Sequence, residues 1–255
     1  MDGGMHPAQD PDKAQDTATG RREDGREDDG RRDANRDADR HAGQDAGYHA
    51  ARFTHDPRRD VLWQTLCRHF FAARVPADGC VLDLGAGYGQ FVNNIQARRR
   101  IALDLWDELP DHVAPGVEAI VGPATDLSPI APGSVDYAFA SNLFEHLTKA
   151  ALTEVLAQLR DRLTARGTLT LLQPNYRYAY AEYFDDYTHE TIFSHVSLAD
   201  FLSANGFEPV EVRPRFLPLS IKGGLPVHPL LIRAYLLSPI KPIGKQMLVV
   251  ARPRR

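Results

Sequence analysis

Cysteine and long apolar runs are the two features that this chain has least of. Only two cysteines occur among 255 residues, and Cys67 and Cys80 both stand in apolar stretches. This usage argues against a disulfide framework and predicts two reduced core residues. No uncharged apolar run of about 18 residues occurs and no apolar h-region follows the N-terminus, so we expect neither a spanning helix nor a signal peptide. The sequence therefore predicts a cytoplasmic protein.

Acidic side chains are absent from one end of the chain. Residues 212–255 carry nine Lys and Arg and no Asp or Glu, whereas residues 1–50 carry 13 acidic and eight basic side chains. Residues 1–50 also hold too few apolar side chains to offset the entropy of ordering, so we predict a disordered, charged N-terminal extension. Residues 51–255 are almost neutral and suit one domain of medium size, for which we expect no nucleic-acid partner.

The chain from residue 56 onward alternates short apolar runs with amphipathic stretches. Asp56 is typical of a helix N-cap, and Gly167 is typical of a helix stop. Helices are predicted over 57–70, 147–165 and 197–205. Strands are predicted over 80–84, 100–104, 117–121, 135–140, 168–172, 207–212 and 246–251. This alternation predicts an α/β fold with a doubly wound, largely parallel sheet and crossover helices.

The most informative motif joins the first predicted strand to a glycine-rich turn. It reads Val81-Leu82-Asp83-Leu84-Gly85-Ala86-Gly87-Tyr88-Gly89-Gln90. The absence of Cβ at Gly85 and Gly87 permits a tight turn close to a ligand, and the helix expected next would offer free N–H groups. A dinucleotide fingerprint would place glycine at position 90, where Gln90 stands, and Asp83 supplies a carboxylate suited to an ammonium group. The motif argues against a nicotinamide-linked reductase, and a plain turn without ligand is the other alternative.

Asp104 ends the second predicted strand, 21 positions after Asp83. Because it combines this acid with the glycine turn, the sequence resembles the class I S-adenosylmethionine-dependent methyltransferase family, in its type 11-like branch, over residues 57–212. The resemblance implies S-adenosylmethionine as the cofactor, ribose hydroxyls bound by Asp104, and a Rossmann-like sheet of seven strands, mostly parallel with an antiparallel last strand. The cofactor-binding residues that it implies are Asp83, Gly85, Ala86, Gly87, Gly89, Gln90, Asp104, Leu105, Asp126 and Asn142.

The segment Gly122–Pro129 departs from the family pattern at the place of adenine recognition. Pro123 replaces the acid that usually follows the glycine. Asp126, or the backbone at Ala124 and Thr125, would then take over the adenine contact. The alternative is that Asp126 is an ordinary turn residue.

A second block of the resemblance runs from Gly133 to Leu147 and contains Asn142-Leu143-Phe144-Glu145-His146. In the family, this turn faces the methyl group of the cofactor. A hydroxyl acceptor needs a base for its proton, and the candidates are His146, His189 and Asp185, with Asp186 as the alternative to Asp185. His146 is favoured because it directly follows the fourth strand, and a structural hydrogen-bonding role is the alternative for each. We assign no metal ligand.

The resemblance also implies a small molecule or a glycan as the methyl acceptor, with O-methylation of a sugar as one form of the reaction. The aromatic-rich segment 175–193 would line its pocket, unless these rings only pack over the sheet edge. A non-catalytic module that binds the cofactor on the same fold is the alternative function.

The basic C-terminal segment includes an insertion at about 213–245, between the last two predicted strands. Within it, residues 229–238 predict a short helix that is apolar nearly all round. Residues 213–255 would contact an anionic membrane surface or the phosphate of an acceptor. The alternative is that the helix packs over the sheet edge or forms a dimer contact.

Overall fold

The computed structural model describes residues 56–219 and 227–254. The charged extension predicted for residues 1–50 lies outside the described residues. The helix predicted before the first strand begins as expected, because Asp56 Oδ1 accepts a hydrogen bond from Arg58 N and Pro57 occupies the first helical position. This helix, α2 (Pro57–Leu66), continues directly into a π-helical turn, η1 (Cys67–Phe71).

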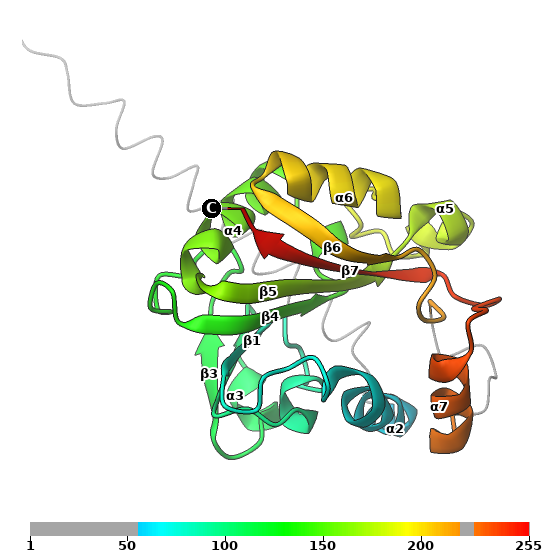
Figure 1. Cartoon of the computed structure of the whole chain (residues 1–255), viewed down its shortest axis with the longest axis horizontal. Coiled ribbons are helices and arrows are strands. Elements are labelled where there is room, and N and C mark those ends of the chain that lie inside the picture. Colours follow the sequence, from blue (N-terminus) through cyan, green and yellow to red (C-terminus); the bar gives the residue numbers. More distant parts are fainter. Residues whose placement is uncertain (1–55, 220–226, 255) are drawn as a thin grey trace, which may run out of the picture. The chain divides into compact units, whose positions relative to one another are not determined.

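Seven strands form one sheet in the order β3-β2-β1-β4-β5-β7-β6 (Figure 1). Their bounds are Cys80–Leu84 for β1, Arg99–Asp104 for β2, Val117–Val121 for β3, Val135–Ser141 for β4, Leu163–Pro174 for β5, Phe207–Arg213 for β6 and Gln246–Pro253 for β7. Strands β1 to β5 pair in parallel, and β7 runs antiparallel to both β5 and β6. The predicted Rossmann-like sheet with its antiparallel last strand is confirmed.

Helices cover both faces of the sheet. On one face, α4 (Lys149–Arg162) and α6 (His195–Ala204) bury apolar side chains against alternate residues of the central strands, Leu82 and Leu84 among them. On the other face, α2 and η1 pack Trp63 and Phe71 against Phe139 of β4. Because successive side chains of a strand point to opposite faces, central strands such as β1 and β4 contribute to both cores and are mainly apolar.

Several crossovers lack the helices that the alternation predicted. Only the 3-10 turn η2 (Val92–Asn94) lies between β1 and β2, a single turn α3 (Leu109–His112) lies between β2 and β3, and no helix forms among the described residues that join β3 to β4. Asn93 of η2 ties this short turn to the end of α3, because its side-chain amide donates to His112 O at 2.8 Å and accepts from Ala114 N at 2.7 Å.

Two predicted boundaries were wrong. Helix α4 ends at Arg162 and β5 begins at Leu163, so Gly167 lies within a strand instead of stopping the helix. A Cβ at Gly167 would lie 2.8 Å from Val135 O, so glycine permits the close approach of β4. The N-cap of α6 is Ser194, three residues before Ser197, and the two serines form a reciprocal capping box.

The other sequence expectations on the core hold. Cys67 and Cys80 both lie in the described part of the chain, are buried and form no disulfide there. Burial raises the pKa of both thiols, most strongly for Cys67. Within residues 56–219 and 227–254, no helix has the length and apolar character needed to cross a membrane.

Candidate functional site

The glycine turn after β1 adopts a conformation that other residues rarely tolerate. Gly85, Gly87 and Gly89 have φ angles of 72°, 51° and 64°, in the left-handed region that L side chains disfavour. Gly85 N and Ala86 N donate to Leu103 O of β2 at 2.8 and 3.1 Å. A Cβ at Gly85 would lie 3.0 Å from Leu143 Cδ1. The turn is thus held to β2 on one side and contacts the turn after β4 on the other.

The helix expected directly after this turn is absent, which corrects one part of the sequence argument. The backbone continues as turns into η2, and Val92 N donates to Asp83 Oδ2 at 3.2 Å. Asp83 is buried, and burial raises its pKa to about 8. Gln90, by contrast, donates from Nε2 to Asp60 Oδ1 of α2 at 3.1 Å. The donors that face this edge therefore come from the turn itself and not from a helix N-terminus.

Asp104 lies where the sequence placed it, at the carboxyl end of β2 beside the glycine turn. Its Oδ2 accepts from Gly87 N at 2.7 Å, and its Oδ1 accepts from Trp106 N at 3.0 Å. The carboxylate therefore ties the glycine turn to the start of the loop after β2. Leu105, the next residue, exposes 46% of its surface, so an apolar face stands beside the carboxylate.

Asn142, the first residue after β4, has a φ of 51°, and it is the only non-glycine residue with positive φ in the described structure. Its N–H donates to Leu172 O of β5 at 2.8 Å, and its Oδ1 accepts from Gln246 Nε2 of β7 at 2.9 Å. Asparagine tolerates this region better than most residues, and such conformations gather at ligand sites. Asn142 thus lies at the same edge of the sheet as the glycine turn.

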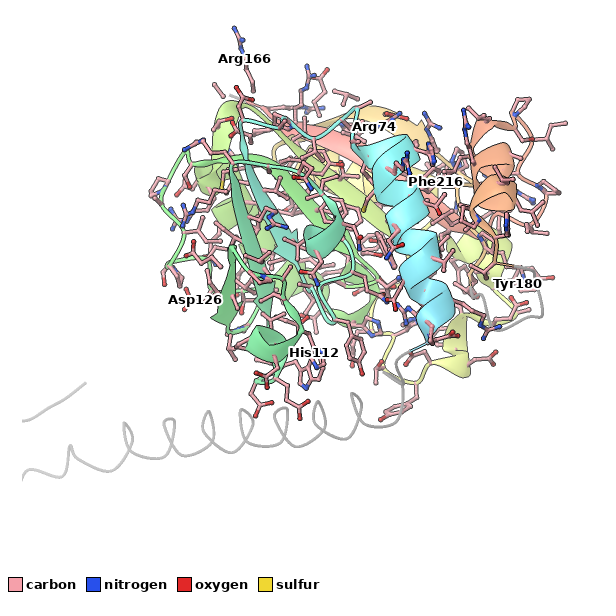
Figure 2. The ribbon with its side chains drawn as sticks, turned by 90° about the horizontal axis from the view of Figure 1, so that it is seen from below. Arg74, His112, Asp126, Arg166, Tyr180 and Phe216 are labelled. Atoms are coloured by element: carbon pink, nitrogen blue, oxygen red, sulfur yellow. The ribbon has the colours of Figure 1, made fainter. Side chains whose placement is uncertain are left out.

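Asp126 lies in the exposed loop between β3 and β4 (Figure 2). Its Oδ1 accepts from Ser128 N at 3.0 Å, and this hydrogen bonding lowers the pKa of its carboxyl group. The geometry is that of an aspartate that closes its own turn. Nearby, Gln158 of α4 holds the same loop, because it accepts from Leu127 N at 2.8 Å and donates to Thr125 O. The adenine role of Asp126 stays a prediction.

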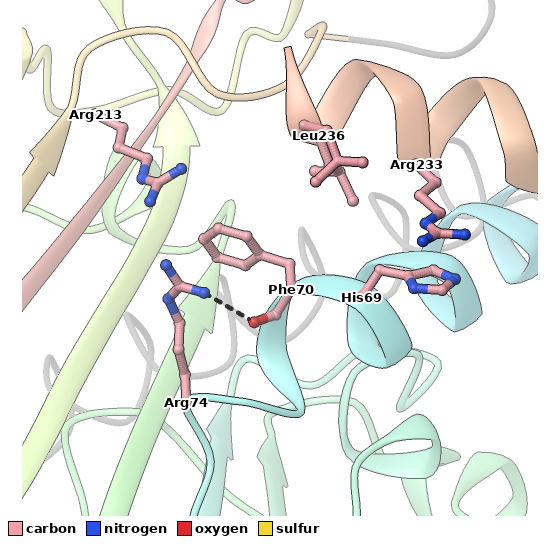
Figure 3. A pocket seen from close by; sticks show the side chains of 7 residues that line it. His69, Phe70, Arg74, Arg213, Arg233 and Leu236 are labelled. Atoms are coloured by element: carbon pink, nitrogen blue, oxygen red, sulfur yellow. Dashed lines mark hydrogen bonds between the residues drawn. The ribbon is translucent and has the colours of Figure 1, made fainter. Parts of the chain in front are cut away.

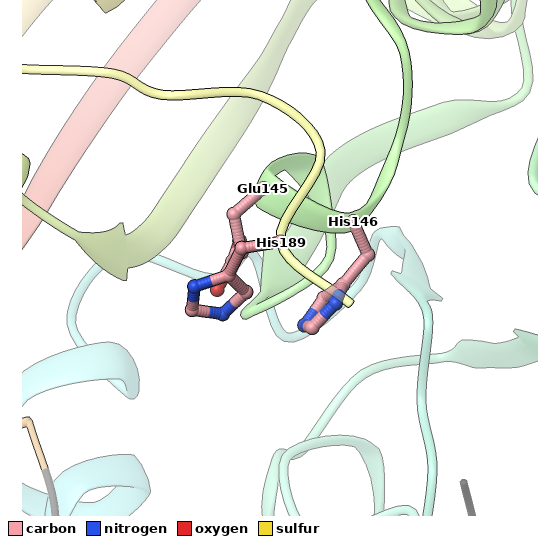
Figure 4. Close-up of side chains that lie close together, drawn as sticks. All are labelled: Glu145, His146 and His189. Carbon is pink, nitrogen blue, oxygen red and sulfur yellow. The ribbon is translucent and has the colours of Figure 1, made fainter. Parts of the chain in front are cut away.

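An ionisable cluster lies just beyond β4, where Glu145 and His146 of the 3-10 turn η3 (Phe144–His146) meet His189 (Figure 4). One side-chain nitrogen or oxygen from each of the three residues lies within 4.8 Å of the others. Glu145 is fully buried, and neither of its carboxyl oxygens has a hydrogen-bond partner among the described residues. Burial raises the pKa of Glu145 to about 8. Asp185, the third predicted catalytic residue, is exposed at the end of η4 (Tyr183–Asp185) and is not a member of this cluster.

Hydrogen bonds fix the orientation of both imidazoles. His189 Nδ1 lies 2.5 Å from Tyr183 O, and His146 Nδ1 lies 2.9 Å from Thr188 Oγ1. Thr188 Oγ1 donates its hydrogen to Asp186 Oδ1 at 2.7 Å, so it accepts from His146. Because a carbonyl oxygen also only accepts, Nδ1 carries the hydrogen in both rings and the lone pair of each neutral ring lies on Nε2.

A family model described as a methyltransferase domain matches residues 57–212, which is more than half of the chain. The chain belongs to this methyltransferase family. No protein of curated function matches it. Solved structures of similar fold include a SAM dependent methyltransferase from Archaeoglobus fulgidus, at 20% identity and TM-score 0.57 over 76% of this chain and 93% of that chain.

Two further structures extend this likeness. A S-adenosylmethionine dependent methyltransferase from Mesorhizobium loti matches at 15% identity and TM-score 0.53, over 71% of this chain and 94% of that chain. Geranyl diphosphate C-methyltransferase from Streptomyces coelicolor A3(2), solved with Mg2+, geranyl diphosphate and S-adenosyl-L-homocysteine, matches at 13% identity and TM-score 0.52, over 75% of this chain and 76% of that chain. The fold is that of class I methyltransferases, and the cofactor of the methyltransferase is S-adenosylmethionine.

Sequence reasoning missed two features of the methyltransferase site. The first is Glu145, which stands within the quoted turn but was given no role, because its burial depends on the return of the segment around His189. The second is an aromatic group beside the glycine turn, in which Trp106 stacks on His112 at 4.5 Å between ring centroids and Tyr88 meets Trp106 edge-on at 5.0 Å. The only sequence signal for this group was the place of Tyr88 inside the glycine motif and of Trp106 two residues after Asp104.

Proposed function

We propose that the methyltransferase transfers a methyl group from S-adenosylmethionine to a hydroxyl of a small-molecule or glycan acceptor, a sugar among the candidates. The observation that carries the proposal is the contact between Gly85 and Leu143, because it joins the glycine turn directly to the turn that bears Glu145 and His146. A cofactor cradle and a group of proton acceptors therefore share one edge of the sheet, the usual place of ligands in open α/β sheets.

The residues present fit the cofactor. A Cβ at Gly85 would fill the space beside Leu143, and the three positive φ angles bring bare backbone to the surface of the cradle. Asp104 would accept from the ribose hydroxyls, and Asp83 would balance the charge of the amino group. Gly87, Gly89, Ala86, Gln90 and Asn142 would shape the same cradle, Leu105 would cover the base, and Asp126 or its neighbouring backbone would contact adenine.

Bound S-adenosylmethionine supplies a sulfonium-linked methyl group that is already electrophilic. The protein then mainly orients the acceptor oxygen behind that methyl group and takes up its proton. His146 and His189 suit the role of proton acceptor, because each ring in its neutral form presents an Nε2 lone pair whose direction is fixed by Thr188 or Tyr183. Asp185 stands exposed outside this cluster, and His146 is our first candidate for the role.

The acceptor would lie against the aromatic segment that follows β5. Tyr183 is buried and donates to Thr191 O at 2.6 Å, so this ring is structural. Tyr180 and Tyr187 expose 67% and 77% of their surface, and Tyr180 points outward beside α5 (Tyr176–Ala179) (Figure 2). The segment thus divides into packed rings, as in the packing alternative, and exposed rings that suit the apolar face of a sugar or a flat ring.

The test is production of S-adenosylhomocysteine by the full chain with a panel of free sugars, nucleotide-linked sugars, glycans and phenols. We expect turnover with at least one class, and His146→Gln should lower kcat for that acceptor by about 10²–10⁴-fold, the scale of general acid–base catalysis. Asp185→Asn is the matched comparison and should change kcat far less. Tight binding of S-adenosylhomocysteine without methylation of any acceptor in the panel, or of any component of a cell extract, would favour the non-catalytic module.

We also propose that the basic C-terminal region contacts an anionic surface or acceptor phosphate. Helix α7 (Pro229–Leu237) packs Tyr235 and Leu236 against the apolar core under α2, as the packing alternative expects. Its other side exposes Leu230 and Leu237 by 67% and 74%. At about 1.5 Å per residue it is far too short to span a bilayer, and an interfacial position would cover these side chains.

A cationic hollow of about 290 Å³ lies beside α7 and supports this second proposal (Figure 3). Its lining includes Arg74, Arg213 and Arg233 together with His69. The Glu211 carboxylate pairs with Arg213, and its Oε1 lies 3.7 Å from Arg74 Nη2. Arg233 therefore supplies positive charge that the Glu211 carboxylate does not offset. Three guanidinium groups around one hollow suit a phosphate oxygen cluster.

Flotation with vesicles separates the membrane contact from the alternatives. We expect binding to anionic but not neutral vesicles, weakened by salt, and loss of binding in a variant with Leu230→Ser and Arg233→Ser. Val210→Ser, which removes an exposed apolar residue on β6, away from α7, should bind like the wild type. Binding of a phosphorylated acceptor without vesicle binding would assign the hollow to the acceptor, and binding of neither at low salt would leave the packing or dimer alternative.

A further inference from the structure

Glu145 is a carboxyl group buried without compensation, and such a group needs a physical explanation. Its side chain is fully buried, and both oxygens lack hydrogen-bond partners among the described residues. Burial of an unpaired polar group is costly, and nearly all buried polar atoms in folded proteins have a partner. The backbone of Glu145 is, by contrast, well satisfied, because its carbonyl accepts from Glu190 N and Thr191 N at 2.8 and 3.0 Å. The position of Glu145 is therefore fixed by backbone hydrogen bonds in which its carboxyl group takes no part.

Two imidazoles stand beside this carboxyl group with their orientation already set. His146 comes from the same 3-10 turn, and His189 comes from the segment between η4 and α6. The nearest ligand atoms of the three side chains lie within 4.8 Å of one another. Two atoms that ligate one ion tetrahedrally at about 2.1 Å stand roughly 3.4 Å apart, so the ligand atoms would have to approach one another by up to about 1.4 Å when the ion binds.

We propose that Glu145, His146 and His189 bind a divalent transition-metal ion, for which Zn2+ is the best match. Two imidazole nitrogens and one carboxylate oxygen suit zinc and its neighbours in the first row, whereas Mg2+ and Ca2+ prefer oxygen ligands alone. A divalent ion would supply the counter-charge that the Glu145 carboxylate lacks. The sequence suggested no such site, because neither the spacing of Glu145 and His146 nor the distant His189 forms a recognisable metal motif.

The surroundings of both imidazoles are those expected of metal ligands. A histidine that binds a metal through one nitrogen usually donates its other N–H to a carbonyl or carboxylate, which fixes the ring and raises its basicity. His189 donates from Nδ1 to the carbonyl of Tyr183. His146 donates from Nδ1 to Thr188 Oγ1, which donates in turn to the Asp186 carboxylate. In both rings the lone pair therefore resides on Nε2, the nitrogen that would ligate the ion.

The site would also deepen the proposed function, on which this one consequence rests. Three protein ligands leave a coordination position open, as in catalytic zinc sites. An acceptor hydroxyl at that position would have its pKa lowered by the ion, next to the turn whose Leu143 contacts Gly85. The ion, instead of an imidazole, would then make the oxygen nucleophilic: the hydroxyl would lose its proton to water, and the O–CH3 bond would form as the S–CH3 bond of the cofactor breaks and S-adenosylhomocysteine leaves.

The test is metal titration of the full, tag-free chain after dialysis against a chelator, without cofactor or acceptor. Calorimetry with Zn2+ should give a stoichiometry of one at the site, with Kd at least about 100-fold below that for Mg2+, as expected for a site with nitrogen ligands. Glu145→Gln and His189→Asn should each weaken Zn2+ binding at the site by more than tenfold. His69→Gln, which removes an exposed histidine from η1, is the matched control and should bind like the wild type.

A second pair of variants keeps the proposal falsifiable if Glu145→Gln fails to fold. Thr188→Val removes the nearer acceptor of His146 Nδ1, the hydroxyl, and leaves only the Thr188 carbonyl at 3.3 Å. It should weaken Zn2+ binding by about 10–100-fold, whereas Thr188→Ser retains the hydroxyl and should bind Zn2+ like the wild type. Equal Zn2+ affinity in the folded wild type and the folded variants would overturn the proposal, and so would absence of one-to-one binding. Because neither cofactor nor acceptor is present, that result would leave the methyl-transfer proposal standing.

Discussion

Replacement of Asp104 is the most direct test of the cofactor site, because its carboxylate has two measurable roles. In the structure it accepts from Gly87 N at 2.7 Å and from Trp106 N at 3.0 Å. In the proposed complex the same oxygens accept from the ribose hydroxyls. Asp104→Ala removes both sets of interactions, and Asp104→Asn keeps one acceptor oxygen but removes the charge.

The magnitudes follow from the kind of bond involved. A hydrogen bond to a charged group contributes about 1.5–3 kcal/mol, so Asp104→Ala should raise the Kd for S-adenosylhomocysteine by roughly 10–150-fold. The loss of the Gly87 and Trp106 bonds should also lower the free energy of unfolding, by about 1–3 kcal/mol for each buried N–H left without a partner. Asp104→Asn should give intermediate values in both measurements.

Calorimetry with S-adenosylhomocysteine gives the affinity, measured well below the melting temperature so that every variant is folded. Urea unfolding at the same temperature gives the free energy of unfolding. Asp107→Asn is the matched control, because Asp107 lies exposed in the same loop and carries the same charge. The reasoning is refuted if Asp104→Ala binds within about twofold of the wild type, since 1.4 kcal/mol corresponds to tenfold. Equal losses of affinity in Asp104→Ala and Asp107→Asn would show that the effect comes from the net charge of the loop and not from the position of the Asp104 carboxylate.

Three further predictions concern the same edge of the sheet. Gly85→Ala should lower the melting temperature by several degrees and weaken S-adenosylhomocysteine binding, because the new Cβ would lie 3.0 Å from Leu143 and the φ at this position is 72°. Gly133 has a φ of 61° but open space around it, so Gly133→Ala is the control that shows the effect of backbone strain alone. Equal falls in melting temperature for the two variants would refute the role of the Leu143 contact. Asn142→Gly should be more stable than Asn142→Ala by about 1 kcal/mol, because only glycine adopts a φ of 51° freely, and urea unfolding that reversed this order would contradict the strain. Burial raises the pKa of Asp83 to about 8 in the folded chain, against an ordinary value of 3.8, so the unfolded state loses its proton first as the pH rises. Wild-type stability should therefore fall relative to Asp83→Asn between about pH 4 and 8, by up to about 1.4 kcal/mol per pH unit. Parallel pH profiles of unfolding for the two proteins would show that Asp83 does not titrate in this way.

Where a signal was local, the sequence determined the structure well. Asp56 and Pro57 started a helix because a carboxylate cap and a fixed φ act within one turn of the chain. The strand that ends at Leu84 and the turn at Gly85 were found because a short apolar run and alternating glycines have few other uses. Asp104 followed from its place at the end of the next strand.

The errors arose where tertiary context overrides a local pattern. Gly167 is typical of a helix stop, yet here it lies within β5, because the β4 backbone passes too close to permit a Cβ. The helix expected after Gly89 does not form, and there the backbone N–H of Val92 donates to the distant, buried carboxylate of Asp83.

The ionisable cluster was decided by tertiary structure alone. Glu145 and His146 are adjacent in the sequence, but the burial of Glu145 and the approach of His189 depend on how the segment after β5 returns to the turn after β4. That return is fixed by strand order and by the backbone bonds from Glu190 and Thr191 to Glu145, which join distant parts of the chain. Periodicity and turn chemistry act over a few residues and set the elements, whereas a site made from separate segments exists only once the packed sheet brings those segments together.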